Sequence, residues 1–107
     1  LPYSAAISLG LAGLADAGRD DLLVLGAEGF PSQYELLADG TIDMVMAFDT
    51  AWTGWAAIDT LNRVLDGAET VDEGVGYQLV TAEDMAGETD YEGPCDCRAG
   101  YSEEWGI

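Results

Sequence analysis

The pattern of apolar and polar positions along the chain predicts three helices that alternate with three short strands. Apolar residues at Ile7, Leu9, Leu11 and Leu14 lie among alanines and glycines, which suits a tightly packed helix over about 4–17 that Gly18 ends. A second, shorter helix is opened by Pro31-Ser32 and closed by Gly40.

The third predicted helix is the longest and carries two tryptophans in its first turns. Thr50 can cap it, and Gly67 can stop it after about Leu65. Apolar residues recur at helical spacing on one face, which is expected to be buried: Trp55, Ile58, Leu61 and Leu65. Trp52 lies off that face, so we read Trp55 as packing and Trp52 as a possible recognition residue.

The strands are predicted at residues 22–25, at TIDMVMAF and at GVGYQLVT. The first run is apolar throughout, as in parallel strands that are covered on both faces. The order helix–strand–helix–strand–helix–strand implies right-handed crossovers and a parallel α/β sheet. From Ala82 on, the chain is acidic and rich in glycine and proline, and we expect a surface tail with Tyr91, Tyr101 and Trp105 as isolated anchors.

The acidic charge is the most unusual total of the sequence. Among 107 residues, 21 are acidic and three are basic, no histidine is present, and the formal net charge is −18. This charge excludes nucleic-acid binding that depends on neutralising phosphates. The carboxylates are dispersed and form no Asp-x-Asp-x-Asp-Gly loop, so a solvated acidic surface is favoured over a calcium site.

The sequence holds no recognisable catalytic constellation. Histidine, the usual general base, is absent, and neither a nucleophile elbow nor a glycine-rich phosphate loop is found. We therefore expect a protein that is not an enzyme and needs no metal or cofactor. Cys95 and Cys97 form a lone Cys-x-Cys, which is too little for zinc. A disulfide across one residue would be strained, so we expect free thiols or partners elsewhere.

Candidate binding residues gather where the predicted strands end, because ligands of open parallel sheets bind beyond the carboxyl ends of the strands. Glu28 lies between Gly26 and Gly29, where its carboxylate can accept hydrogen bonds or bind an amine, or can be an ordinary solvated turn residue. Phe48 ends the second strand and faces either the core or a cleft. The flat ring of Trp52 can stack on a sugar face or an apolar ligand.

A family resemblance covers residues 3–107. It rests on LLVLGAEGFPSQYELLADGTIDMVMAFDTAWTGWAAIDTLNRVLDG followed by GVGYQLVTAED. These stretches resemble the C-terminal part of type I periplasmic sugar-binding proteins of ABC transporters. The shared pattern is a strand, a Gly-x-Asp-Gly-like turn, a helix, a strand that crosses between lobes, a helix ending in Leu-x-Gly and a closing strand before Thr-x-Glu. The ending YEGPCDCRAGYSEEWGI resembles a tail seen in part of that family.

The resemblance implies an α/β fold with Rossmann-like parallel sheets in two lobes, of which this chain is the C-terminal part. Residues 1–47 would belong to the C-terminal lobe. Residues 48–75 would form a crossover and a helix of the N-terminal lobe, and residues 76–107 the return strand and a C-terminal tail. The ligand would lie between the two lobes.

The resemblance also implies which residues contact the ligand. Glu28 falls where the family usually has a ligand-binding aspartate, and Phe48 falls at a lobe crossover where a polar contact is common. Tyr3 falls just before the first helix, where an asparagine or aspartate often binds sugar hydroxyls. Asp49 and Trp52 would lie at the edge of the same cleft. Tyr3, Glu28 and Phe48 each differ from the residue usual in the family.

By this resemblance the protein is the extracytoplasmic solute-binding component of an ABC importer, in the periplasm or as a cell-surface lipoprotein. Its partners would be a sugar or sugar-like small molecule, the remaining N-terminal part of the same protein and the membrane permease, with no nucleic acid. Two alternatives stay open. One is the effector-binding domain of a lactose-repressor-like transcription regulator, and the other is a stand-alone acidic interaction module that folds alone.

The net charge predicts that salt stabilises the protein. A net charge of −18 on a small surface causes self-repulsion, which destabilises the compact state at low ionic strength. Added salt screens this repulsion. We expect the melting temperature to rise between low and molar sodium chloride. A melting temperature that stays flat or falls over this range would show that the charges do not act in this way.

Overall fold

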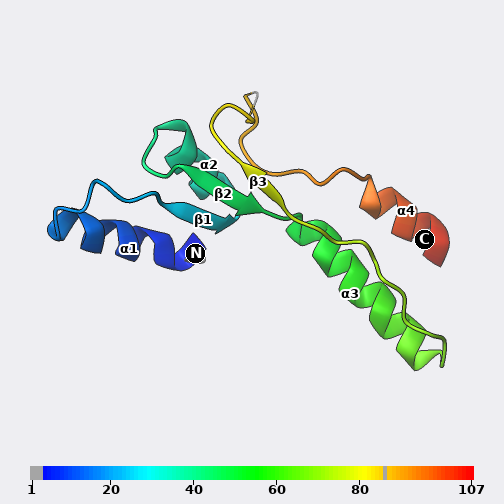
Figure 1. Cartoon of the computed structure of the whole chain (residues 1–107). Coiled ribbons are helices and arrows are strands. Elements are labelled where there is room, and N and C mark those ends of the chain that lie inside the picture. The colour runs from blue at the N-terminus through cyan, green and yellow to red at the C-terminus, as the bar shows by residue number, and fades with distance from the viewer. Residues whose placement is uncertain (1–3, 86) are drawn as a thin grey trace. The chain divides into compact units, whose positions relative to one another are not determined.

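The computed structural model describes residues 4–85 and 87–107, and within them the chain forms four helices and three strands (Figure 1). None of the described helices is long and apolar enough to span a bilayer. The elements are α1 (Ser4–Asp16), β1 (Leu25–Glu28), α2 (Pro31–Ala38), β2 (Met44–Ala47), α3 (Thr50–Leu65), β3 (Gln78–Val80) and α4 (Cys97–Trp105).

Two compact units make up the chain. Unit 1 comprises Leu1–Phe48 and Tyr77–Tyr91, and it holds the sheet with α1 and α2. Unit 2 comprises Asp49–Gly76 and Glu92–Ile107, and it holds α3 and α4. The backbone therefore passes from one unit to the other three times, and each unit is built from two separate stretches of sequence.

The sheet of unit 1 is mixed, with the strand order β1-β2-β3. Strands β1 and β2 are parallel, as predicted, and Leu25 pairs with Met44. Strand β3 is antiparallel to β2, so the expectation of a wholly parallel sheet is wrong for this strand. The register gives the reason: Gln78 pairs with Ala47, so the chain enters the sheet again at the end where β2 leaves it.

The first strand lies three residues later than the apolar run predicts, at Leu25–Glu28 instead of 22–25. Leu23, inside the predicted strand, is 80% exposed. Just before the β1–β2 pairing begins, two hydrogen bonds join Val24 to Asp43. The Val24 N–H donates to the Asp43 carboxylate (2.7 Å), and the Val24 carbonyl accepts from the Asp43 N–H (2.9 Å). Pairing, and not hydrophobicity alone, therefore decides where the strand begins.

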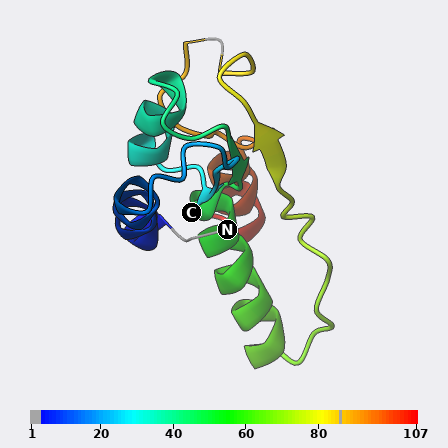
Figure 2. The same ribbon diagram turned by 60° about the vertical axis from the view of Figure 1, so that its left-hand side comes forward.

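The core of unit 1 lies on one face of the sheet. Burial alternates along β2, where Val45 and Ala47 are buried while Met44 and Met46 are only partly buried. Helices α1 and α2 lie on the same side of the sheet and share this core (Figure 2). The buried cluster consists of Ile7, Tyr34, Leu37, Ile42, Val45, Ala47, Val80 and Met85.

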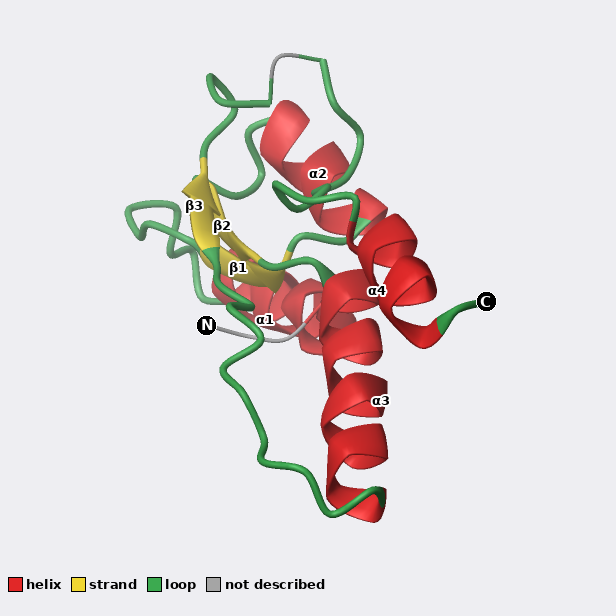
Figure 3. Ribbon diagram, turned by 90° about the vertical axis from the view of Figure 1, so that its right-hand side faces the viewer, coloured by secondary structure: helices red, strands yellow, loops and turns green. Residues whose placement is uncertain are grey.

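Unit 2 is built on the contact between α3 and α4, which lie side by side (Figure 3). The expected buried face of α3 is wrong for most of its members: Ile58 and Leu61 are exposed, and Leu65 is 75% exposed. The helix instead buries Ala56 and Asp59. The reason is that α4 packs on the side of α3 that carries Trp55 and Asp59.

The C-terminal stretch, for which the sequence predicted a surface tail, contains a helix at Cys97–Trp105 that was not predicted. The Asp96 side chain accepts a hydrogen bond from the N–H of Ala99 and thereby caps the helix. Gly106 adopts a left-handed conformation (φ 71°) and ends it. Local capping signals thus outweigh the acidic, glycine-rich composition.

Gly29 occupies the tightest position in unit 1. Its φ is +78°, and a Cβ added there would lie 2.7 Å from the Cβ of Ala47. Gly40 has the same φ of +78°, but an added Cβ would meet nothing within 4 Å. Comparing substitutions at the two glycines therefore distinguishes the free-energy cost of a left-handed backbone, which both share, from the cost of a steric overlap, which only Gly29 has.

We expect Gly29→Ala to destabilise the protein far more than Gly40→Ala. Gly40→Ala should cost about 1 kcal/mol, because an L-residue is strained in the left-handed region. Gly29→Ala adds an overlap with a buried strand, which should cost about 1–3 kcal/mol more. Urea unfolding of the two variants and the parent measures this difference. Equal losses of unfolding free energy in the two variants would mean that β2 can shift at Ala47 without cost.

Candidate functional site

The carboxyl ends of β1 and β2 bring Glu28 and Phe48 together. Glu28 is the last residue of β1, and Phe48 directly follows β2. The N–H of Phe48 donates to the carbonyl of Glu28 at 3.4 Å, so the two backbones are adjacent at one edge of the sheet. Both side chains are partly buried. This is the edge at which parallel sheets bind ligands.

Glu28 has an unusual backbone conformation. Its φ is +85°, and among the described residues it is the only non-glycine with a positive φ. A side chain in this region costs energy and persists only where the surroundings impose it, and such positions concentrate at functional sites. The next residue, Gly29, also has a positive φ, and it packs so close to Ala47 that a side chain there would overlap it.

Two further residues hold this turn in place. Gln33 of α2 is completely buried, and its Oε1 accepts a hydrogen bond from the N–H of Gly29 at 3.1 Å. The N–H of Tyr91 donates to the carbonyl of Gly29 at 3.3 Å. Both peptide groups of Gly29 are thus fixed by residues from other parts of the sequence, and Glu28 is preorganised at the edge. The sequence did not point to Gln33, which carries no recognisable motif, and it pointed to Tyr91 only as an anchor of the C-terminal tail.

Asp49 and Trp52 belong to unit 2, and they are joined at the start of α3. Asp49, and not Thr50 as predicted, caps the helix, because its Oδ1 accepts from the N–H of Trp52 at 2.9 Å. The other carboxylate oxygen, Oδ2, accepts from the N–H of Gly93 at 3.1 Å. The Trp52 ring lies against Gly74, where an added Cβ would be 3.7 Å from Cζ2. Tyr3 lies outside the described residues.

A buried carboxylate organises unit 2, and sequence reasoning missed it. Asp59 is 3% exposed. Its Oδ1 accepts from the indole Nε1 of Trp105 at 2.8 Å, and its Oδ2 accepts from Nε of Arg63. The Trp105 hydrogen bond, followed by the Arg63 guanidinium, lowers the pKa of Asp59 below its usual range. Arg63 also pairs with Glu104 through Nη2 at 2.7 Å.

Three aromatic rings pack beside this carboxylate. The rings of Trp55 and Tyr101 are stacked with centroids 6.2 Å apart, and Trp105 lies 5.3 Å from Trp55. The Tyr101 hydroxyl donates to Oε2 of Glu73 at 2.8 Å, and burial together with this hydrogen bond raises the pKa of Tyr101. The spacing of Tyr101 and Trp105, four residues apart between Asp96 and Gly106, is the signal that could have revealed this helix face.

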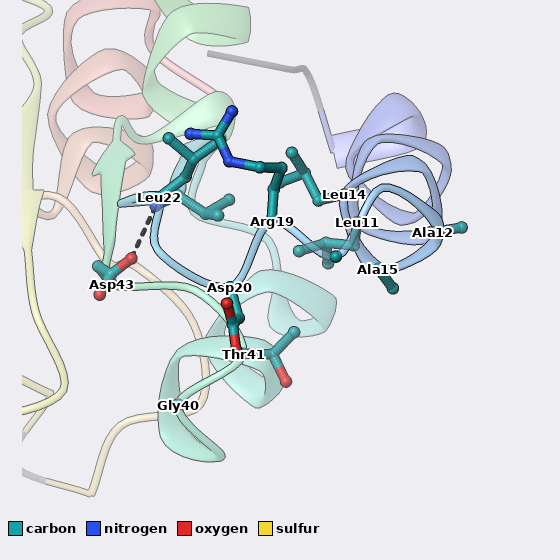
Figure 4. A pocket seen from close by; sticks show the side chains of 12 residues that line it. Leu11, Ala12, Leu14, Ala15, Arg19, Asp20, Leu22, Gly40, Thr41 and Asp43 are labelled. Carbon is teal, nitrogen blue, oxygen red and sulfur yellow. Dashed lines mark hydrogen bonds between the residues drawn. The ribbon is translucent and has the colours of Figure 1, made fainter.

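A cavity of about 740 Å³ lies in unit 1 near the start of the strands, at the opposite edge from Glu28 (Figure 4). It is lined by Leu11 and Leu14 of α1, by Leu22, and by the polar residues Arg19 and Asp43. The Arg19 guanidinium is paired with Asp21, and the Asp43 carboxylate accepts from the N–H of Val24. The Arg19 and Asp43 side chains are thus already used within the protein, whereas Asp20 and Thr41 are further polar residues that line the cavity.

In the part of the chain that the structure describes, no group of three or more Cys, Asp or Glu side chains is placed to hold a metal ion. Cys95 and Cys97 are joined in a disulfide, so the expectation of free thiols is wrong. Their Cα atoms are 5.1 Å apart, within the range that a disulfide spans.

Comparison of the chain with protein-family models, with curated proteins and with solved structures finds no match.

We expect Asp59→Asn to destabilise unit 2 in a pH-dependent way. Because the fold lowers the pKa of Asp59, its stabilisation is present above the unfolded pKa of about 3.9 and is lost as pH falls through the folded value. The melting temperature of the variant should lie several degrees below that of the parent at pH 7, and the gap should close in acid. All three tryptophans lie in unit 2, so tryptophan fluorescence can follow this transition.

Asp21→Asn is the matched control. Arg19 lowers the pKa of Asp21 too, but the two side chains of this pair are 49% and 62% exposed. Exposed pairs contribute little, so this variant should melt close to the parent at every pH. If Asp59→Asn behaved like the control, the buried carboxylate would not organise unit 2.

Proposed function

We propose that this chain is part of the extracytoplasmic solute-binding component of an ABC importer and that it binds a sugar or related small polar ligand. The observation that carries the proposal is Glu28, a non-glycine residue held at φ +85° on the carboxyl edge of two parallel strands. A non-glycine residue is strained in this conformation, and strained positions of this kind concentrate at functional sites.

The chemistry of this edge suits a polyol. An ionised carboxylate only accepts hydrogen bonds, and with two oxygens it can receive two neighbouring hydroxyls. Such charge-assisted bonds are about twice as strong as neutral ones. Phe48, adjacent to Glu28, supplies the flat apolar surface that the ring face of a sugar needs. Tyr3, Asp49 and Trp52 complete the proposed set of ligand contacts.

The organisation of the chain supports a two-lobe protein. The backbone passes three times from one unit to the other, after Phe48, Gly76 and Tyr91. We propose that residues 1–47 belong to one lobe, that residues 48–75 form a crossover and a helix of the other, and that residues 76–107 supply the return strand and a C-terminal tail.

Exposed apolar surface supports a further partner, which we propose is the remaining N-terminal part of the same protein. Leu79 on the sheet is exposed, as are Leu61 and Leu65 on α3. Apolar side chains that stay exposed on each unit are the kind of surface that a further partner can cover. The membrane permease of the transporter is the second proposed partner. The charge of −18 works against the alternative of a DNA-bound regulator.

The disulfide supports the proposed location outside the cytoplasm. Disulfides persist in oxidising environments such as the periplasm and the cell surface, and they are rare in reducing cytosol. The Cys95–Cys97 bond in this chain fits such a compartment.

We expect Glu28→Gln to weaken sugar binding while the fold is kept. Calorimetric titration of the whole protein with a panel of neutral monosaccharides should identify a ligand of the parent. Loss of one charged acceptor should lower the affinity by about 1.5–3 kcal/mol, which is roughly 10- to 100-fold. Glu28→Gly should bind no better than Glu28→Gln and yet unfold at higher urea, since glycine relieves the strained φ.

Glu35→Gln is the control, because Glu35 is an exposed carboxylate on the neighbouring helix α2. It should leave both affinity and stability unchanged. The proposal fails if the parent binds no monosaccharide in the panel, or if Glu28→Gln binds as tightly as the parent.

A further inference from the structure

Helix α4 is a weak helix by its own sequence. It has nine residues, which is short for a helix in water, and Gly100 lies in its middle. Its charges oppose the helix dipole, with Arg98 in the first turn and Glu103 and Glu104 in the last. The helix must therefore be held by its cap and by its contacts with the rest of unit 2.

Those contacts are the ones that organise unit 2. Tyr101 donates to Glu73, and Trp105 donates to Asp59. Glu104 pairs with Arg63 across the α3–α4 contact. If α4 lost its helical form, these three interactions would break together, because a helical turn sets the spacing of the residues that make them.

The disulfide sits at the start of this helix. Cys97 is its first residue, Asp96 is its cap, and Cys95 is exposed immediately before the cap. The bond thus closes a small ring around Asp96, the residue whose carboxylate accepts from the N–H of Ala99 at 3.2 Å. The covalent ring restricts the backbone of the residue that caps α4.

From this placement we propose that Cys95–Cys97 is a thiol–disulfide exchange site, at which reduction by a dithiol uncaps α4 and loosens its packing on α3. This proposal is independent of the sugar site. Three features favour exchange. The ring spans one residue, so closing it removes little entropy from the unfolded chain. Cys95 is open to a reductant. Cys97 lies at a helix N-terminus, which stabilises its leaving thiolate, although the Asp96 carboxylate acts in the opposite sense.

The exchange balances with the dithiol as the named reductant. One thiolate of the dithiol attacks Sγ of Cys95, the Cys95–Cys97 bond breaks, and Cys97 leaves as a thiolate that takes up a proton. The second thiol of the dithiol then attacks the mixed disulfide and releases Cys95. The protein gains two electrons and two protons, and the dithiol becomes a disulfide.

Tryptophan fluorescence and thiol counting test the proposal in the whole protein under native conditions. Dithiothreitol is the probe, and alkylation with N-ethylmaleimide followed by mass measurement counts the opened cysteines. We expect two alkylated cysteines at millimolar reductant and a shift of tryptophan emission in step with them, since Trp52, Trp55 and Trp105 all report on unit 2. Oxidised glutathione should restore the original emission.

Two variants make the outcome decisive. The double variant Cys95→Ser/Cys97→Ser should show the emission of the reduced protein without any reductant and should not respond to dithiothreitol. Gly100→Ala, where an added Cβ meets nothing within 4 Å, should strengthen α4. It should therefore reduce the emission shift while the same two cysteines are alkylated.

Three results would overturn the proposal. Cysteines that stay protected from alkylation until the protein is unfolded would show that no exchange occurs in the native state. Full reduction without a change of emission would show that α4 does not depend on the bond. A shift of equal size in the double variant would show that the reductant acts elsewhere.

Discussion

The close approach of Gly29 to Ala47 is the constraint on which unit 1 depends. The turn between β1 and α2 passes so close to β2 that a side chain at Gly29 would overlap Ala47. This contact fixes the parallel pairing of β1 with β2 at its carboxyl end. Glu28, the residue before Gly29, has a positive φ, and its backbone is bonded to that of Phe48. Packing in the core and the polar edge of the sheet therefore meet at one turn.

Unit 2 is held together mainly by polar interactions. It has few buried apolar side chains among the described residues, and its α3–α4 contact centres on the buried carboxylate of Asp59. Such a network stabilises only if each buried polar group has a partner, and removing one partner leaves a costly charge. Asp59 meets this condition through Trp105 and Arg63. Unit 1 is held mainly by a cluster of buried apolar side chains, whereas unit 2 depends on particular polar atoms.

The sequence predicted most of the elements, and the errors have identifiable causes. The helices that begin at Ser4, Pro31 and Thr50 were found, because caps, prolines and glycines are local signals. The antiparallel direction of β3 and the three-residue shift of β1 were missed, because both are set by pairing between distant residues. Helix α4 was missed because composition was weighed above the Asp96 cap. For the candidate site, the sequence pointed to Glu28 and its glycines, but a positive φ at a glutamate has no signature in the local sequence.

Because basic residues are scarce, Arg63 is important for the electrostatic balance of unit 2. The chain has three arginines and 21 acidic side chains, so most of the acidic side chains have no basic residue to pair with. Arg19 pairs with Asp21 on the surface, where screening makes the pair weak. Arg63 is shared between Asp59 and Glu104, and Glu73 also acts on it. In such an acidic protein, one partly buried cation offsets the repulsion among three carboxylates, and this lets α4 pack on α3 despite the charges that both helices carry.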